Sequence, residues 1–425
     1  MDWHIDTKCV QEGYSPKSGE PRVVPIVQST TFRYETAESM GALFDLEADG
    51  FFYTRLGNPT SDAVEKKIAS LEGGVAAMMT SSGMAATLLA VLNITNAGDH
   101  VVASSALYGG SFNLLQNTLT KLGIETTFVE PDTDEDTLKA AFKENTKCVF
   151  GETLSNPSLN VLNIEMFARQ AHAHHVPLIV DNTFPTPIHC QPIKFGADIV
   201  VHSTSKYMDG HAVSLGGVIV DSGNFDWYSG NFPGLTTPDE SYHGLVYCEQ
   251  FGKAAFVARA RTQLMRDFGP APSPFNAFLL DLGLDTLPLR MEKHSKNALY
   301  IAKELEKDDR IAWVSFPDLE NDRFHSLMEK YMPNGTCGVI SLGIAGGREK
   351  ASAFQSHLKL AAIATHVADV RTCVLHPASA THRQMNDQQL IEAGVKPEMV
   401  RFSVGIENPE DILADIKQAL DATFA

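Results

Sequence analysis

The sequence is poor in cysteine, and nothing about its cysteines indicates a disulfide or a metal site. The six cysteines lie far apart in 425 residues and form no C-x-x-C pair, a pattern that fits reduced thiols in the cytosol. The cluster of His172, His174 and His175 has no cysteine or carboxylate at ligand spacing. We therefore expect no disulfide and no bound metal, and we expect these histidines to lie on a solvated helix.

The chain also lacks a cationic leader, a long hydrophobic run and a block of basic residues. Its start, MDWHIDTK, does not resemble a secretory signal, so we expect a cytoplasmic protein. The most apolar window, AAMMTSSGMAATLLAVLNIT (76–95), is interrupted by polar residues, which favours a buried helix over a membrane span. A formal net charge of -18 without clustered Lys or Arg disfavours nucleic acid and membranes as partners.

The distribution of apolar residues along the chain is typical of a folded α/β protein with a second domain. A length of 425 residues exceeds the roughly 250–300 at which one core usually stops growing. Residues 1–60 are rich in turn signals and predict an extended arm. From 61 to 262 short apolar runs alternate with helical patterns, which predicts a large α/β domain with a mainly parallel sheet, followed by a smaller α+β C-terminal domain, 263–425. The segment 223–244 is too long for a plain connection, so it is a functional lid or a disordered insertion, and its aromatics favour an ordered loop.

Two ionisable residues follow apolar runs of the predicted sheet, where ligand-binding residues of such sheets collect. Lys206 comes after ADIVVHS and is flanked by three hydroxyl residues, 203–205. Its amine can form a Schiff base with a carbonyl while the hydroxyls bind an anion. Asp181 ends the run PLIV, where a carboxylate is costly unless it faces a partner such as a protonated pyridine nitrogen. The alternatives are that Lys206 is a surface lysine in a loop and that Asp181 is the N-cap of the next helix.

Two further stretches supply what a planar, phosphorylated cofactor needs. In SSGMAAT (81–87), Ser and Gly precede a helix of small residues, so backbone N–H groups can bind a phosphate at the helix N-terminus. In LYGGS (107–111), the ring of Tyr108 can lie on a planar cofactor. A helix start without a ligand and a core tyrosine are the alternatives. Together with Lys206 and Asp181, these parts predict pyridoxal phosphate bound covalently to Lys206.

Several stretches resemble those of the Cys/Met-metabolism family of pyridoxal-phosphate enzymes, and the resemblance covers nearly the whole chain. It implies the pyridoxal-phosphate transferase fold type I, like that of aspartate aminotransferase, with a mainly parallel seven-stranded sheet in the large domain. It also implies active-site-sharing dimers that build a homotetramer. The matching stretches are YTRLGNPT (53–60), SSGMAA (81–86), ETLSNP (152–157), VDNTF (180–184), HSTSKY (202–207), HPASATH (376–382) and RFSVGIE (401–407).

The resemblance implies a role for each residue expected in the site. Lys206 would bind the cofactor and share proton transfers with Tyr108, which would also stack on the ring. Asp181 would pair with the ring nitrogen. Arg401 would bind the substrate carboxylate, a task suited to a bidentate guanidinium, and Asn156 would lie near the ring hydroxyl and the substrate. The implied phosphate ligands are Ser82, Gly83, Met84, Ser203 and Ser205, with Tyr53 and Arg55 reaching the phosphate of a neighbouring subunit.

Within the family, the chain is similar to the O-acetylhomoserine sulfhydrylases in KYMDGHAVSLGGVIVDSGNFDW and TPDESYHGLVY. The implied reaction is γ-replacement on O-acetyl-L-homoserine by sulfide or methanethiol through a pyridoxal-phosphate ketimine, giving L-homocysteine or methionine and acetate. A methionine γ-lyase or a cystathionine γ-synthase is the alternative. Methionine γ-lyases have a cysteine shortly after the stacking tyrosine, where this chain has Gly110, and this difference disfavours the lyase.

One stretch departs from the sulfhydrylase pattern. Where Asn, an aliphatic residue, Gly and Asp usually precede the HPAS motif, this chain has His366, Val367, Ala368 and Asp369. The resemblance places His366 near the substrate carboxylate. We therefore expect His366 to contribute to substrate binding and to bear on the choice of amino acid or nucleophile.

Overall fold

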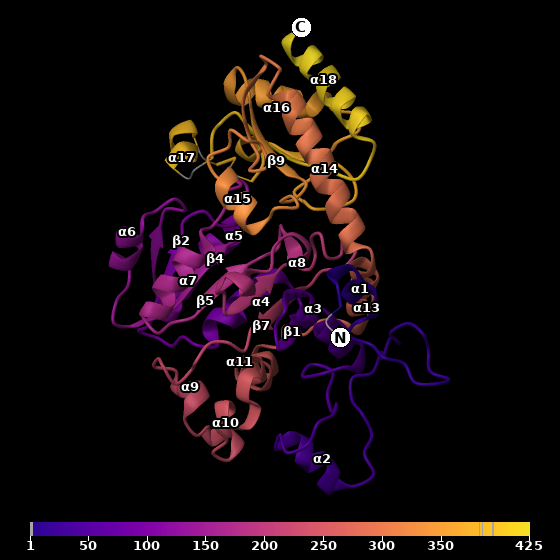
Figure 1. Ribbon diagram of the computed structural model, residues 1–425, viewed down its shortest axis with the longest axis vertical. Helices are drawn as coiled ribbons and strands as arrows, with labels where there is room; N and C mark the ends of the chain where they lie inside the picture. The colour runs from indigo at the N-terminus through magenta and orange to yellow at the C-terminus, as the bar shows by residue number, and fades with distance from the viewer. Residues whose placement is uncertain (1–2, 382, 385, 393–394) are drawn as a thin grey trace.

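The computed structural model describes residues 3–381, 383–384, 386–392 and 395–425, which form two β-sheets (Figure 1). The larger sheet is built from residues 76–221 and the smaller one from 311–403. Figure 1 shows the C-terminal domain above the large domain, with α14 (Leu287–Leu305) running along one side between them. The predicted α/β class with a smaller C-terminal α+β domain is confirmed, while the residue boundaries of the domains stay predictions.

The described part of the large domain has a seven-stranded sheet in the order β1-β7-β6-β5-β4-β2-β3. Neighbouring strands are parallel from β6 to β3, and β7 runs antiparallel to both β1 and β6. The prediction of a mainly parallel seven-stranded sheet is therefore confirmed. Its strands are β1 (Ala76–Thr80), β2 (His100–Ser104), β3 (Glu125–Val129), β4 (Thr146–Glu152), β5 (Leu178–Asp181), β6 (Ile199–His202) and β7 (Gly217–Asp221).

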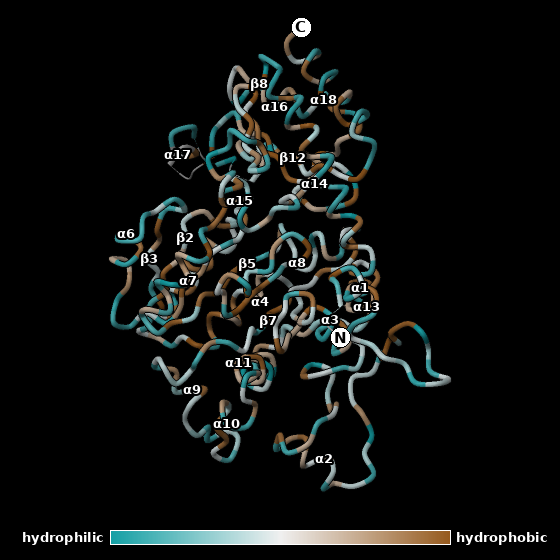
Figure 2. Tube along the Cα trace, in the orientation of Figure 1, coloured by the Kyte–Doolittle hydropathy of each residue, from teal (hydrophilic) through white to brown (hydrophobic). Residues whose placement is uncertain are grey.

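Burial on both faces explains why these segments form a parallel sheet. The strands β2, β4, β6 and β7 are buried along their whole length, as expected where helices cover both faces. Figure 2 shows hydrophobic segments gathered along the strands in the interior of both domains. Because β4, β5 and β6 are parallel, their final residues, Glu152, Asp181 and His202, lie at one edge of the sheet, the edge at which such sheets bind ligands.

Helix α3 (Pro59–Glu72) begins and ends at residues suited to those positions. The Asn58 side chain accepts a hydrogen bond from the N–H of Thr60, and Pro59 occupies the first helical position. Gly73 ends the helix in the left-handed conformation, with φ of 78°. The other helices of this part are α4 (Gly83–Leu92), α5 (Gly109–Asn113), α6 (Glu135–Ala140), α7 (Ile164–Ala173), α8 (Thr186–His189), α9 (Pro233–Thr236), α10 (Tyr247–Phe251), α11 (Ala255–Arg259) and α12 (Arg266–Phe268).

The apolar window 76–95 is a strand followed by a helix, so the prediction of one buried helix is wrong for its first part. Strand β1 pairs antiparallel with β7 from Ala76 opposite Asp221 to Thr80 opposite Gly217. Helix α4 begins only at Gly83, after Ser82. A short apolar run does not distinguish a buried strand from a buried helix. Pairing with β7, which is remote in the sequence, decides the outcome.

The N-terminal arm is also not extended throughout. It contains α1 (Ile5–Gln11) and α2 (Ala37–Phe44). Helix α1 packs against α3 and α13 and buries Cys9 completely, and α2 buries Leu43. The prediction of an extended arm is wrong for these two segments, because apolar side chains in them find partners. In Figure 1 the part of the arm that carries α2 projects away from the body of the large domain.

The segment 223–244 has a defined conformation that its aromatic residues stabilise, as predicted. The rings of Phe225, Trp227 and Phe232 contact one another at centroid distances of 4.8, 5.2 and 5.8 Å. Trp227 also stacks on Phe256 at 5.4 Å. Figure 1 shows α9, which belongs to this segment, at the end of the large domain opposite the C-terminal domain.

The C-terminal domain has a five-stranded sheet in the order β10-β11-β12-β9-β8 in the described chain. Strands β11, β12, β9 and β8 pair antiparallel, and β10 joins β11 in parallel. Among the described residues no helix is both long and apolar enough to cross a membrane. The strands are β8 (Ile311–Ser315), β9 (Val339–Ile344), β10 (Ala362–Ile363), β11 (Cys373–Leu375) and β12 (Met399–Ser403), and the remaining helices are α13 (Pro274–Asp285), α15 (His325–Tyr331), α16 (Gly347–His357), α17 (Asp387–Glu392) and α18 (Pro409–Phe424).

Candidate functional site

Lys206 lies in the turn that follows β6. The turn is held by hydrogen bonds from the Lys206 N–H to the Ser203 carbonyl (3.3 Å) and from the Gly210 N–H to the Lys206 carbonyl (2.7 Å). The Lys206 Nζ has no hydrogen bond or ion pair with the residues that the structure describes. Burial lowers the pKa of this amine, and the charge of Arg401 lowers it further. More of the amine is therefore neutral than in a surface lysine, as a nucleophile or a base requires.

Asp181 ends β5 and presents one carboxylate oxygen that is not hydrogen-bonded within the described chain. Its Oδ1 accepts hydrogen bonds from the Thr183 N–H (2.9 Å) and the Thr183 hydroxyl (2.5 Å). Burial raises the pKa of Asp181, while the bonds from Thr183 and the charge of His202 oppose the rise. A cation near Oδ2 would therefore stabilise the ionised carboxylate.

Thr183 also connects Asp181 to the turn that carries Lys206. Its hydroxyl oxygen accepts a hydrogen bond from the Ser203 N–H (2.9 Å) while it donates to Asp181. One side chain thus fixes the end of β5 relative to the residue after β6. The sequence reasoning missed Thr183, although an Asp followed two residues later by Thr is a signal for a local side-chain to backbone turn.

Glu152 is a second carboxylate at this edge, and it too was missed. It ends β4, and its Oε1 accepts a hydrogen bond from the Tyr108 N–H (2.7 Å). Burial raises its pKa well above the usual range, and the charge of Asp181 adds to the rise. A carboxylate that ends a buried strand was the signal used for Asp181, and the same signal applies to Glu152 in TKCVFGE.

The start of α4 lies directly against Ser203. Ser82 caps the helix by accepting a hydrogen bond from the Ala85 N–H (3.2 Å). A Cβ atom on Gly83 would lie 2.6 Å from the Ser203 Cβ, so only glycine permits this approach. Ser205 sits next to Lys206, and its hydroxyl accepts a hydrogen bond from the Gly216 N–H (2.9 Å) and contacts the Gly216 carbonyl (3.2 Å). The helix N-terminus and the Lys206 turn therefore form one wall of the site.

Tyr108 is half exposed and lies over Gly110. A Cβ atom on Gly110 would lie 2.5 Å from the Tyr108 Cε1 and 3.2 Å from the Met84 Sδ. The Tyr108 ring therefore packs against Gly110, and a side chain at position 110 would displace the ring. The core-tyrosine alternative does not apply, because 50% of Tyr108 is exposed.

Arg401 reaches the same region from the C-terminal domain. It lies on β12, and its Nη1 donates to the Asn156 Oδ1 (2.8 Å), just after β4. Its Nη2 donates to the Thr365 carbonyl (3.4 Å). Burial lowers the pKa of Arg401 to about 10, which leaves the guanidinium charged at neutral pH. Its Nε is buried and has no hydrogen-bond partner among the described residues.

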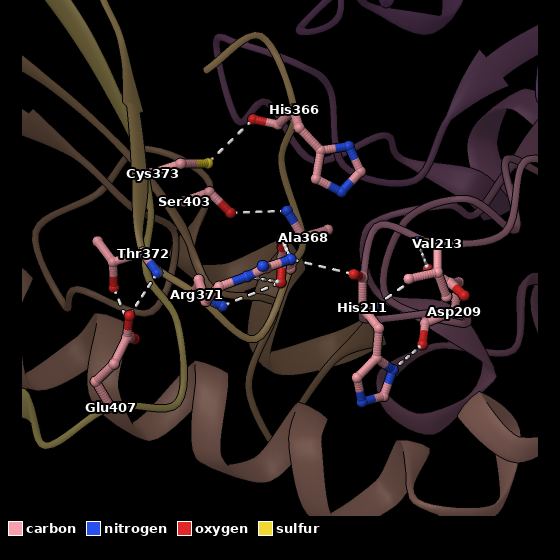
Figure 3. Close-up of polar contacts among 11 residues, drawn as sticks. Asp209, His211, Val213, His366, Ala368, Arg371, Thr372, Cys373, Ser403 and Glu407 are labelled. Atoms are coloured by element: carbon pink, nitrogen blue, oxygen red, sulfur yellow. Dashed lines mark hydrogen bonds and ion pairs between the residues drawn. The ribbon is translucent and has the colours of Figure 1, made fainter. Parts of the chain in front are cut away.

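His366 lies on a loop that is tied to β11 and β12 (Figure 3). The Cys373 thiol donates to the His366 carbonyl (3.1 Å), and the Ala368 N–H donates to the Ser403 hydroxyl (2.7 Å). Figure 3 shows the imidazole pointing away from the strands that carry these two anchors. Burial lowers the pKa of His366, and the charge of Lys206 lowers it further. The imidazole is therefore neutral at pH 7, and its Nε2 is buried without a partner in the described chain.

The same loop contacts the segment that follows Lys206. Arg371 donates to the His211 carbonyl (3.1 Å) and forms an ion pair with Asp369 at 2.8 Å (Figure 3). Ala368 has φ of 67°, a conformation that favours glycine and costs an alanine about 1 kcal/mol. The substitution noted in the sequence at this position is therefore tolerated at a small cost in strain, and the N–H bond to Ser403 opposes that cost.

Tyr53 and Arg55 lie elsewhere in this chain. Both are exposed on the arm, with the Arg55 guanidinium 4.9 Å from the centre of the Tyr53 ring. They line a cavity of about 340 Å³ together with Tyr242, His243 and Arg266.

Most of the predicted site residues lie together at the junction of the two domains, and only Tyr53 and Arg55 lie apart from them. The residues that come together are Lys206, Asp181, Tyr108, Ser82, Gly83, Met84, Ser203, Ser205, Asn156, Arg401 and His366.

The assembled residues fit a phosphorylated pyridine aldehyde. They offer an amine with a lowered pKa, a carboxylate with a free oxygen, a helix N-terminus and two buried nitrogens without partners, Arg401 Nε and His366 Nε2. Buried polar groups usually have a hydrogen-bond partner, so these two nitrogens are available to a bound molecule. In the described chain no three His, Cys, Asp or Glu side chains are grouped so that they could hold a metal ion.

The chain matches the family described as "Cys/Met metabolism PLP-dependent enzyme" over residues 6–421. It is 46% identical over 408 residues to the O-acetyl-L-homoserine sulfhydrylase of Leptospira meyeri, covering 94% of this chain and 92% of the relative. It is 45% identical over 422 residues to the homocysteine synthase of Schizosaccharomyces pombe, covering 98% of each. A crystal structure of a putative O-acetylhomoserine (thiol)-lyase from Campylobacter jejuni, which contains N′-pyridoxyl-lysine-5′-monophosphate, has a TM-score of 0.94 at 36% identity and covers 99% of this chain and 100% of its own.

The match extends over almost the whole sequence, and the two sulfhydrylase and synthase relatives exceed 40% identity. The predicted family, fold class and cofactor are confirmed. The chain belongs to the Cys/Met metabolism family of pyridoxal-phosphate-dependent enzymes.

Proposed function

We propose that the enzyme catalyses γ-replacement on O-acetyl-L-homoserine by sulfide or methanethiol, giving L-homocysteine or methionine and acetate. The relatives named as O-acetyl-L-homoserine sulfhydrylase and homocysteine synthase support this function, because both are aligned with almost the whole chain. The observation that carries it within the molecule is the meeting of Lys206, Asp181 and Arg401 at one domain junction. Nothing in the site favours the γ-lyase or the cystathionine γ-synthase.

Lys206 is the residue that we propose to bind the cofactor and to move protons. Pyridoxal phosphate, when bound, supplies an aldehyde that condenses with amines and a ring that accepts the electrons released at the substrate α-carbon. The lowered pKa of Lys206 keeps its Nζ free of a proton more often than that of a surface lysine. In the proposed reaction, this Nζ would take the proton from the substrate Cα. The hydroxyl of the half-exposed Tyr108 would share these proton transfers.

Asp181 and Tyr108 would set the orientation of the ring. The free Oδ2 of Asp181 would face the ring nitrogen and hold a proton there, because two bonds from Thr183 fix the carboxylate through its other oxygen. Tyr108 would stack on the ring. Glu152, which holds the Tyr108 backbone, would keep that tyrosine in register with Asp181.

The phosphate would bind between α4 and the Lys206 turn. The close approach of Gly83 to Ser203 supports this position, because it brings backbone N–H groups and hydroxyls to one place. The ligands that we propose from this chain are Ser82, Gly83, Met84, Ser203 and Ser205. Tyr53 and Arg55, being exposed on the arm, would complete the phosphate site of a neighbouring subunit, and we propose a homotetramer built from such dimers.

Arg401 would bind the substrate carboxylate. Its Nη1 is occupied by Asn156, so the unpartnered Nε and the weakly bonded Nη2 form the edge available for two hydrogen bonds. Asn156 would thereby orient the guanidinium as well as approach the ring hydroxyl. The neutral imidazole of His366 would lie beside the same substrate.

We also propose that the enzyme works in the cytoplasm. All six cysteines are free thiols, and five of them are buried. Thiols of this kind are compatible with a reducing compartment.

The direct test of the function is product identity. The purified enzyme, loaded with pyridoxal phosphate, is incubated with O-acetylhomoserine and sulfide, and the amino-acid product is identified by mass. We expect homocysteine, and methionine when methanethiol replaces sulfide. Formation of 2-oxobutyrate and ammonia without added thiol would show a γ-lyase, and cystathionine formed with cysteine as the preferred nucleophile would show the synthase.

Gly110 provides a prediction about the tyrosine. In Gly110→Ala the new Cβ would lie 2.5 Å from the Tyr108 ring, so the ring has to move. We expect kcat/KM for homocysteine formation to fall by up to about 10²-fold, since displacement of a reacting group by an ångström has effects of that size. Steady-state kinetics with O-acetylhomoserine and sulfide measure the loss.

Gly109 is the matched control for this variant. A Cβ atom there meets nothing within 4 Å, so Gly109→Ala should keep near wild-type kinetics. If Gly110→Ala were as active as Gly109→Ala, the position of the Tyr108 ring would not matter for the reaction.

A further inference from the structure

Glu72 is not one of the candidate site residues, yet its side chain is hydrogen-bonded to the ends of two strands that position site residues. It is the last residue of α3 and is completely buried. Its Oε1 accepts hydrogen bonds from the Asn182 Nδ2 (2.9 Å) and the His202 Nε2 (2.6 Å). Asn182 directly follows the end of β5, and His202 ends β6. One carboxylate oxygen therefore joins the two strand ends.

The register of the strands shows which residues this contact positions. In the parallel pair of β5 and β6, Asp181 lies opposite Val201, and the Asn182 N–H donates to the Val201 carbonyl (3.0 Å). Side chains alternate between the faces of a sheet. Asn182 and His202 thus turn to the face covered by α3, and Asp181 turns to the other face.

On each face of the sheet, a separate set of hydrogen bonds connects the end of β5 to the end of β6. On the side of Asp181, the Thr183 hydroxyl connects Asp181 to the Ser203 N–H. On the opposite side, Glu72 connects Asn182 to His202. The residues next to these ties are Asp181, which precedes Asn182, and Ser203, which follows His202. Their separation is therefore fixed from both faces of the sheet.

The surroundings make the Glu72 contact strong. Asn182 is 0% and His202 is 1% exposed, so no bulk water competes for the Glu72 oxygen. Hydrogen bonds to a buried carboxylate are stronger than those between neutral groups. The charge of His202 also reaches Asp181, whose pKa it lowers.

We propose that Glu72 is a positioning residue of the cofactor site, which sets the separation between Asp181 and the turn bearing Ser203 and Lys206. The inference rests on the proposed site, in which Asp181 would bind the ring nitrogen and Ser203 the phosphate of the same molecule. A change in their separation weakens one contact or the other. Glu72 itself touches neither the cofactor nor the substrate.

The test compares three variants of the full-length protein. Glu72→Met removes the acceptor oxygen, and Glu72→Gln keeps an oxygen but removes the charge. Glu65→Gln is the control, because Glu65 is a buried glutamate on the same helix that binds Arg261 (2.7 Å) and the Met79 N–H (2.7 Å), away from the ends of β5 and β6. Three quantities are measured: the Kd of pyridoxal phosphate for the apoprotein, the pH at which the visible absorption of the bound cofactor changes, and the Tm of the apoprotein.

We expect Glu72→Met to raise the Kd by about tenfold or more, the effect of losing hydrogen bonds to a charged group, and to shift the spectral transition. Glu72→Gln should shift the same transition in the same direction with a smaller change in Kd. Glu65→Gln should lower the Tm and leave both cofactor readouts at wild-type values.

The inference is overturned if the Glu72 variants lower the Tm as Glu65→Gln does but bind the cofactor with wild-type Kd and spectrum. If Glu72→Met does not fold, Glu72→Gln decides by its spectral transition alone. A wild-type protein that binds pyridoxal phosphate but forms no homocysteine would contradict the proposed reaction and leave this test intact.

Discussion

Replacing Lys206 with alanine is expected to lower kcat/KM for homocysteine formation by about 10⁴-fold, the upper range for loss of a general acid and base. The substitution removes the only atom of this residue that can bond to the cofactor aldehyde and move the Cα proton. No other lysine has been placed in this cluster, so no neighbouring amine takes over the task. Steady-state kinetics and the visible absorption of the purified variant measure both losses.

A surface lysine is the control for this experiment. Lys66 is exposed and pairs with Asp62 at 2.5 Å, so Lys66→Ala should keep wild-type activity and absorption. Partial rescue of Lys206→Ala by added methylamine would support the loss of a base as the cause. Turnover of Lys206→Ala near the wild-type rate would refute the assignment.

Replacing Asp181 with asparagine is expected to lower kcat by roughly 10²–10³-fold, the range found when one preorganised electrostatic group is removed. Asparagine keeps an oxygen to accept the two bonds from Thr183, so the backbone and the side-chain position should be preserved. It removes the negative charge that would hold a proton on the ring nitrogen. The loss should therefore appear in kcat and in the absorption spectrum of the loaded enzyme.

In the protein without cofactor, the same Asp181→Asn substitution should not lower the thermal stability. Burial raises the pKa of Asp181, which shows that its charge is unfavourable in the folded chain without a cationic partner. The Tm of the Asp181→Asn apoprotein should therefore equal or exceed that of wild type. Asp198→Asn is the control, because Asp198 is a buried aspartate beside the amino end of β6 that binds His172 (2.8 Å) and the Leu178 N–H (2.8 Å).

Asp198→Asn should leave kcat within a few-fold of wild type, because Asp198 lies away from the candidate site. If Asp181→Asn and Asp198→Asn lowered kcat equally, the effect of Asp181 would be structural. An unchanged kcat in Asp181→Asn would remove Asp181 from the mechanism.

The parts of the site that could be predicted from the sequence are those with a local signal. Lys206 and Asp181 each follow a run of apolar residues, and Ser82 and Gly83 stand where a helix begins. In a parallel sheet such signals are sufficient to place residues at one edge, because every parallel strand ends there. Glu152 carried the same signal and was still missed.

The parts that could not be predicted depend on contacts between remote residues. Glu72 is 110 residues from Asn182 and 130 residues from His202, and Arg401 is 245 residues from Asn156. The periodicity of apolar residues, which predicts helices and strands, contains no information about such remote pairs. The same holds for β1, whose identity as a strand depends on β7 and not on its own composition. Local patterns predicted which residues reach the edge of the sheet, and tertiary contacts determine how they are held there.

The most direct test of the central claim is to locate the covalent bond to the cofactor. The enzyme loaded with pyridoxal phosphate is reduced with borohydride and digested, and its peptides are sequenced by mass spectrometry. We predict that the reduced pyridoxyl phosphate group is attached to the peptide that contains Lys206 and to that lysine alone. A modified lysine elsewhere with Lys206 unmodified, or no modified peptide at all, would contradict the account.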